Sequence, residues 1–176
     1  DIAAIREMSR YWEHVRAQYA AFESGIPAPA SEVYLHEMPG GQFTNLKAQA
    51  RSLGLEERWP EVAQAYADAN QMFGDIVKVT PSSKVVGDMA LMMVAQNLTR
   101  AQVEDPAVDV PFPDSVADML RGNLGQPHGG WPKGIQAKVL KGETPLTTRP
   151  GAEVPAVDLE AVREKLSSEL NGFRVD

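Results

Sequence analysis

Apolar residues recur three or four positions apart along most of this chain, and this spacing favours a fold built from helices. In the first 22 residues the positions between them hold charged side chains such as Arg6, Arg10 and Glu13. A spacing near 3.6 puts apolar side chains on one face of an α-helix, whereas a half-buried strand has a period of 2. The segment is predicted to be an amphipathic helix that covers an apolar surface and ends at Ser24-Gly25. Its apolar stripe consists of Ile5, Met8, Trp12, Val15, Tyr19 and Phe22.

The same spacing predicts further helices along the chain. Gly54 and Gly74 stand where two of them should end, and Asp158 can cap the last one. Thr80 followed by Pro81 fits an N-cap with proline at the first helical position. The predicted helices cover about residues 44–53, 60–73, 80–98, 99–104, 115–120 and 134–140, and a last one begins at 158.

The predicted fold class is mainly α, with irregular Pro/Gly-rich loops between the helices. A change of texture near residue 98 divides the chain into a helical region, 1–98, and a helical extension, 99–176. The extension contains a Pro-rich linker at 143–157 before its last helix. The methionines of the 80–98 helix are expected in its core rather than on a cofactor surface, and they are Met89, Met92 and Met93.

Charge argues against some classes of partner. The chain has 17 basic and 24 acidic residues, a formal charge of -7 and a sequence pI near 5.0. Phosphate backbones and anionic membrane surfaces repel such a protein, so neither nucleic acid nor a membrane is expected as a partner. The chain starts at Asp1 with no Met and no signal peptide, which suggests a piece of a longer, cytoplasmic protein.

The residues that commonly bind metals are scarce. The chain has no cysteine, and His14, His36 and His128 form no closely spaced pair. A metal site would therefore need carboxylates gathered from distant segments, and none is expected. Two glycine pairs, at 40–41 and 129–130, lack the spacing of a phosphate loop and are predicted to be tight turns with positive φ.

The segment from Lys78 to Lys84 carries the strongest candidate chemistry. A Thr hydroxyl, two Ser hydroxyls and a Lys ammonium share one turn at a predicted helix start. Such a turn can bind a small polar or anionic ligand, and a hydroxyl can accept and donate a proton in one event. A capped helix start with exposed Ser and Lys explains the same residues without any ligand, and the residues alone favour it over a binding site.

Three stretches of the chain resemble the biotin-dependent carboxylase family, in particular the carboxyltransferase region of pyruvate carboxylases. They are residues 37–46 (EMPGGQFTNL), 70–90 (NQMFGDIVKVTPSSKVVGDMA) and 124–132 (LGQPHGGWP). The resemblance implies a helical region that follows a TIM-type barrel and forms a funnel over its active site. There, carboxybiotin on a swinging carrier domain carboxylates pyruvate to oxaloacetate.

The resemblance also implies roles for individual residues. Thr80 is the expected catalytic residue, as a proton relay between pyruvate and the biotin ring nitrogen, and Ser83 and Lys84 are the expected biotin contacts. Biotin is the implied cofactor, carried on another domain, while ATP and a divalent metal bind in parts of the parent enzyme absent from this chain. The implied partners are the rest of the barrel, the carrier domain, pyruvate and the other subunits of a homotetramer. The chain alone is expected to be inactive.

Two other hypotheses are kept. The first is the equivalent region of an oxaloacetate decarboxylase or transcarboxylase subunit. The second is a non-catalytic helical interaction module, which predicts that Thr80 and Lys84 point to bulk solvent with no cleft beside them.

Overall fold

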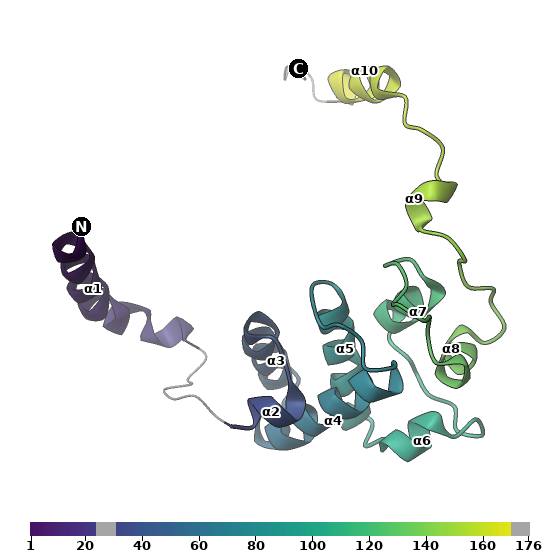
Figure 1. The fold of residues 1–176 in the computed structure, drawn as a ribbon, viewed down its shortest axis with the longest axis horizontal. Helices are drawn as coiled ribbons and strands as arrows, with labels where there is room; N and C mark the ends of the chain where they lie inside the picture. Colours follow the sequence, from purple (N-terminus) through teal and green to yellow (C-terminus); the bar gives the residue numbers. More distant parts are fainter. Residues whose placement is uncertain (24–30, 170–176) are drawn as a thin grey trace.

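The computed structural model describes residues 1–23 and 31–169, and within these ranges it consists of helices and loops, with no strand. The prediction of a mainly helical chain is therefore confirmed. Helix α1 (Ile2–Arg16) continues into a 3-10 turn, η1 (Ala17–Phe22). The predicted stop at Ser24-Gly25 lies outside the described residues. Figure 1 shows α1 standing apart from the other helices.

The predicted apolar stripe of α1 is present and exposed. Most side chains on it are more than half exposed, as Ile5 (63%) and Trp12 (57%) illustrate, while Val15 is partly buried, and α1 has no buried residue. An amphipathic helix gains most of its stability by burying such a face. The surface that this stripe is expected to cover is therefore not found among the described residues.

The centre of the molecule is a pair of helices, α4 and α5, that lie side by side, with α3 packed on α5 (Figure 1). This pair and the residue that ends α4 supply several of the largest fully buried side chains, among them Tyr66, Phe73, Met89 and Met93. Met89 and Met93 are thus helix core, as predicted, and Met92 is partly buried against the same core. The elements of this half are α2 (Val33–His36), α3 (Gly40–Ser52), η2 (Glu56–Arg58), α4 (Trp59–Met72) and α5 (Ser82–Ala95).

Three short helices extend the same core beyond residue 98. They are α6 (Arg100–Glu104), α7 (Asp114–Arg121) and α8 (Lys133–Leu140). Thr99 and Gln102 form a reciprocal capping box at the start of α6. A single hydrophobic cluster runs from Met38 through Val103 and Leu120 to Val139, so the core crosses residue 98. The division into 1–98 and 99–176 stays a prediction.

The chain after α8 leaves the core. Most of the predicted linker at 143–157 is exposed and contains only one short helix, α9 (Pro150–Glu153), before α10 (Leu159–Glu169). The Oδ1 atom of Asp158 accepts hydrogen bonds from the backbone N–H groups of Glu160 and Ala161, at 3.0 and 3.1 Å, which confirms the predicted cap. Helix α10 buries no side chain, and Figure 1 shows it apart from the central helices.

The prediction for the two glycine pairs was right for one and wrong for the other. Gly129 and Gly130 have φ of 86° and 78°, as expected for a tight turn. Gly40 and Gly41 instead form the first turn of α3, which therefore starts four residues before the predicted position 44. Pro39, with φ -57° and ψ 144°, sets the direction of the chain just before this helix. Two glycines cost a helix only about 1 kcal/mol each, which packing of the following residues offsets.

Candidate functional site

The Thr80 segment is an irregular loop of residues 75–81 between the two central helices. Gly74 (φ 94°) and Asp75 (φ 54°) both adopt left-handed backbone conformations that reverse the chain after α4. Asn70 holds this reversal, because its backbone O accepts from the N–H of Asp75 at 2.9 Å and its Nδ2 donates to the Asp75 carboxylate at 2.7 Å. Ile76 is buried, and the chain then returns to the surface at Thr80, which is exposed.

The prediction that Thr80 caps the following helix was wrong. Helix α5 begins at Ser82, with Pro81 in the N-cap position and no side-chain cap. The Ser82 hydroxyl, rather than that of Thr80, makes the local hydrogen bonds with the backbone. It accepts from the N–H of Val79 at 3.2 Å and lies 2.8 Å from the carbonyl oxygen of Val79 and 2.7 Å from that of Val77. The hydroxyl of Thr80 has no hydrogen-bond partner among the described residues.

Ser83 and Lys84 lie on the first turn of α5 but face different surroundings. Ser83 is only 5% exposed, and its carbonyl oxygen accepts from the hydroxyl of Tyr66 at 3.4 Å. Burial raises the pKa of Tyr66 to about 12, so this hydroxyl stays a neutral donor at physiological pH. The exposed Lys84 donates to Asp88 at 2.7 Å, and the same carboxylate oxygen accepts from the Ser115 hydroxyl of α7, also at 2.7 Å.

Gln42 is a further polar residue near this helix start, and the sequence reasoning missed it. Its side chain comes from α3 and is buried, and its Nε2 atom has no hydrogen-bond partner among the described residues. It packs against Gly87, one turn after Ser83 on α5. A glycine in a helix interior often marks a close packing contact, so Gly87 was the available signal.

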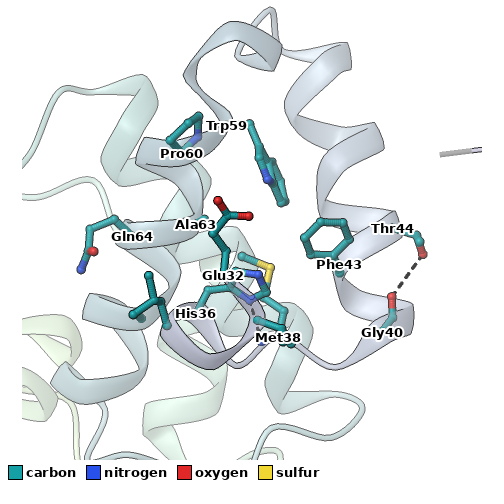
Figure 2. A pocket seen from close by; sticks show the side chains of 13 residues that line it. Glu32, His36, Met38, Gly40, Phe43, Thr44, Trp59, Pro60, Ala63 and Gln64 are labelled. Carbon is teal, nitrogen blue, oxygen red and sulfur yellow. Dashed lines mark hydrogen bonds between the residues drawn. The ribbon is translucent and has the colours of Figure 1, made fainter. Parts of the chain in front are cut away.

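An apolar cavity lies elsewhere, between α2, α3 and α4. It has a volume of about 640 Å³ and a mainly apolar lining. Figure 2 shows Phe43 beside Trp59, whose rings pack edge to face at 5.1 Å. His36 closes one side, where its Nδ1 accepts from the N–H of Met38 at 3.0 Å, and burial lowers its pKa below the ordinary value. Thr80, Ser83 and Lys84 do not line it.

Thr80 and Lys84 also lie outside the smaller, polar cavity of about 520 Å³ that adjoins the first. Both residues are exposed to solvent in this chain, as the interaction-module hypothesis predicts. Within residues 1–23 and 31–169, no group of three or more His, Asp or Glu side chains is placed to hold a metal. In the same ranges no helix has the length and apolarity to cross a membrane.

Comparison with known proteins gives these residues their context. Residues 33–175 match the family described as a conserved carboxylase domain, so the chain belongs to that domain family. It is 50% identical over 171 residues to the pyruvate carboxylase of Bacillus subtilis and 48% identical over 164 residues to the mitochondrial enzyme of Homo sapiens. The alignments cover 97% and 92% of this chain, but only 15% and 14% of those relatives. The chain belongs to the pyruvate carboxylase family.

Solved structures place the chain within one domain of that enzyme. The carboxyltransferase domain of Rhizobium etli pyruvate carboxylase superimposes with a TM-score of 0.93 and 66% sequence identity, covering 99% of this chain and 29% of that chain. Another structure of the same domain was determined with pyruvate and biocytin. The chain is therefore a region of a carboxyltransferase domain. These findings favour the carboxyltransferase region of a pyruvate carboxylase over the decarboxylase, transcarboxylase and interaction-module alternatives.

Proposed function

We propose that this chain forms one wall of the site where the carboxyl group of carboxybiotin is transferred to pyruvate to give oxaloacetate. The observation that carries the proposal is the Thr80 hydroxyl, which belongs to an exposed residue at the end of the loop, next to the start of α5, and has no hydrogen-bond partner among the described residues. The loop is held from both sides, by Asn70 through Asp75 and by Ser82 through Val79. A relative whose carboxyltransferase domain binds pyruvate and biocytin supports the assignment.

In the proposed reaction Thr80 relays a proton. Its oxygen accepts a proton derived from the pyruvate methyl group while its own proton passes to the ring nitrogen of biotin, so the hydroxyl ends neutral. Because the hydroxyl passes a proton without storing charge, it needs no shifted pKa. Carboxybiotin supplies the carboxyl group when it is bound. The new carbon–carbon bond of oxaloacetate would form at the pyruvate carbon that has lost the proton, while the bond between the carboxyl carbon and the biotin ring nitrogen breaks and that nitrogen takes the Thr80 proton.

The first turn of α5 carries polar groups that can form hydrogen bonds with the ureido end of biotin. The ammonium of Lys84 is an exposed donor suited to a carbonyl oxygen, and its pairing with Asp88 keeps it near the helix surface. Ser83 offers a hydroxyl, although its 5% exposure leaves only a small part of the residue accessible. We propose Lys84 as the main biotin contact of this chain and Ser83 as a second one.

The remaining parts of the reaction belong to segments outside this chain. We propose that a TIM-type barrel precedes it, that the exposed face of α1 packs on the rest of the domain, and that a carrier domain delivers biotin. Binding of ATP and a divalent metal, a cytoplasmic location and a homotetramer stay predictions for the parent enzyme. On this proposal the isolated chain is inactive, because it supplies only one wall of the site.

The test is the Thr80→Ala substitution in the whole enzyme, with oxaloacetate formation measured beside ATP cleavage. Loss of the relay should lower carboxyl transfer about 10²- to 10⁴-fold and leave ATP cleavage in the presence of free biotin unchanged. Thr80→Ser keeps the hydroxyl and should retain much of the rate. Thr44→Ala, at an exposed threonine of α3, is the matched control. Near wild-type oxaloacetate formation by Thr80→Ala would show that the relay is wrong.

A further inference from the structure

The Thr80 loop is tied to the junction of α2 and α3 by an ion pair that joins distant parts of the sequence. The Nζ atom of Lys78 lies 2.9 Å from Oε2 of Glu37, a residue 41 positions earlier. The two side chains differ in exposure, since 11% of the Lys78 side chain and 63% of the Glu37 side chain are accessible. The Lys78 side chain is thus nearly buried, and its ammonium pairs with the carboxylate of the exposed Glu37 side chain.

This pair differs from an ordinary surface salt bridge. Exposed ion pairs contribute little, but a lysine that is almost buried loses much of its hydration and needs a partner for its charge. Glu37 is the only hydrogen-bond partner of the Lys78 ammonium among the described residues. Removal of Glu37 would therefore leave a poorly solvated charge in the middle of the loop.

The backbone fixes Glu37 in place. Glu37 has φ 51° and ψ 30°, a left-handed conformation that is uncommon for residues other than glycine. It is the C-cap of α2, and its N–H donates to the carbonyl of Val33 at 2.8 Å. On its other side, the N–H of Met38 donates to His36. Glu37 is thus held between two hydrogen-bonded groups, and this fixed backbone presents its carboxylate to Lys78.

Lys78 stands at a sensitive position in the loop. It comes two residues before Thr80, between the reversal at Asp75 and the Ser82 hydroxyl. Those two anchors hold the ends of the loop, and the ion pair holds its middle. A shift of about 1 Å in a reacting group can cost about a hundredfold in rate, so an anchor this close to Thr80 affects catalysis without touching substrate.

We infer that Glu37, acting through Lys78, is a positioning residue for the Thr80 hydroxyl. The inference rests on the proposed function of Thr80. It gives a role to the first of the three motif stretches, residues 37–46, which contains none of the proposed catalytic or biotin-binding residues. In this role Glu37 and Lys78 contact neither pyruvate nor biotin.

The experiment compares Glu37→Gln, Lys78→Met and the double variant in the whole enzyme, at a temperature where circular dichroism shows all three folded. Each single variant should lower kcat for oxaloacetate formation about ten- to a hundredfold, with KM for pyruvate nearly unchanged and ATP cleavage intact. The double variant should be no slower than the slower single, because both changes break one contact. Lys78→Arg, which keeps the charge, should recover most of the rate.

Two further variants sharpen the test. In a Thr80→Ala background, Lys78→Met should cause no additional loss, because the residue it positions is already gone. Glu56→Gln removes the exposed partner of Arg51 in a pair of 2.6 Å and should leave kcat unchanged.

Several outcomes overturn the inference. Multiplicative losses in the Glu37 and Lys78 double variant would show that the two residues act independently. An unchanged kcat in both single variants, with only thermal stability reduced, would show a purely structural pair. A further loss on top of Thr80→Ala would show that Lys78 acts on something else. Failure of the proposed function is distinguished by a single variant. If Thr80→Ala alone leaves oxaloacetate formation intact, the proposed role of Thr80 is wrong, whatever the Glu37 and Lys78 variants show.

Discussion

The Nε2 atom of Gln42 lies only 2.5 Å from the point where a Cβ atom on Gly87 would stand. The same Cβ would meet Cδ1 of Leu46 at 3.0 Å. Both contacts come from α3, so the missing side chain at Gly87 lets α3 lie directly against α5 one turn after Ser83. An interior glycine lowers the stability of a helix, but a larger side chain at Gly87 would prevent the close approach of α3 to α5.

Gly87→Ala should therefore destabilise the protein, although alanine is the better helix former. We expect a loss of about 1–3 kcal/mol in the free energy of unfolding, because a buried methyl group must displace Gln42 and Leu46. The measurement is urea unfolding of the carboxyltransferase domain that contains this chain. Gly134→Ala in α8 is the control, since a Cβ there meets nothing within 4 Å and should be neutral or stabilising by about 0.5–1 kcal/mol. Equal stability of the two variants would contradict the packing argument.

Ser82→Ala should loosen the Thr80 loop. The substitution leaves the N–H of Val79 without its acceptor and removes the donor to the nearby carbonyls, a loss of about 0.5–1.5 kcal/mol. Amide hydrogen exchange should become faster at Val79 and its neighbours. Ser52→Ala removes a hydroxyl that donates to the Gln49 carbonyl at the end of α3 and should leave exchange in the loop unchanged. Unchanged exchange at Val79 in Ser82→Ala would mean that the hydroxyl does not hold the loop.

The helices were predictable because each depends on residues close together in sequence. The apolar stripe of α1 and the cap at Asp158 appeared where the pattern placed them. The start of α5 did not, because Thr80 and Ser82 both carry a hydroxyl suited to local hydrogen bonds. Sequence spacing favoured Thr80 as the cap, whereas in the fold Ser82 reaches back to Val79.

The contacts that position the proposed site join residues far apart in sequence, and spacing alone does not predict them. Glu37 meets Lys78 across 41 residues, and Gln42 meets Gly87 only after α3 has packed on α5. Thr80 was assigned by resemblance to a family. The structure adds that Thr80 is exposed in a loop that Asn70 and Ser82 hold by hydrogen bonds.

His36 should make the protein sensitive to acid. Its Nδ1 accepts the N–H of Met38, so the ring must stay neutral there, and burial lowers its pKa below the ordinary value of 6.5. The unfolded chain then binds a proton more readily than the folded one. The contribution of neutral His36 to the free energy of unfolding is therefore complete above about pH 6.5 and is lost as the pH falls below that value. The measurement is the melting temperature between pH 5 and 8.

His36→Asn keeps an acceptor for Met38 but does not titrate, so its melting temperature should fall less between about pH 6.5 and 5 than that of the unchanged protein. His14→Asn, on the exposed surface of α1, should behave like the unchanged protein. Identical pH profiles for His36→Asn and the unchanged protein would exclude His36 as the source of the acid sensitivity.

Trp12 should stabilise the whole domain far more than it stabilises this chain. Its side chain is 57% exposed on an apolar stripe with no cover among the described residues, and a stripe of this kind normally packs on another surface. Trp12→Ala should lower the free energy of unfolding of the carboxyltransferase domain by about 2 kcal/mol or more, the scale of burying a large apolar side chain. In the isolated chain the same change should instead reduce aggregation. Arg10→Ala, on the charged side of α1, should do neither. A domain that tolerates Trp12→Ala as well as Arg10→Ala would mean that the stripe stays open to solvent in the parent enzyme.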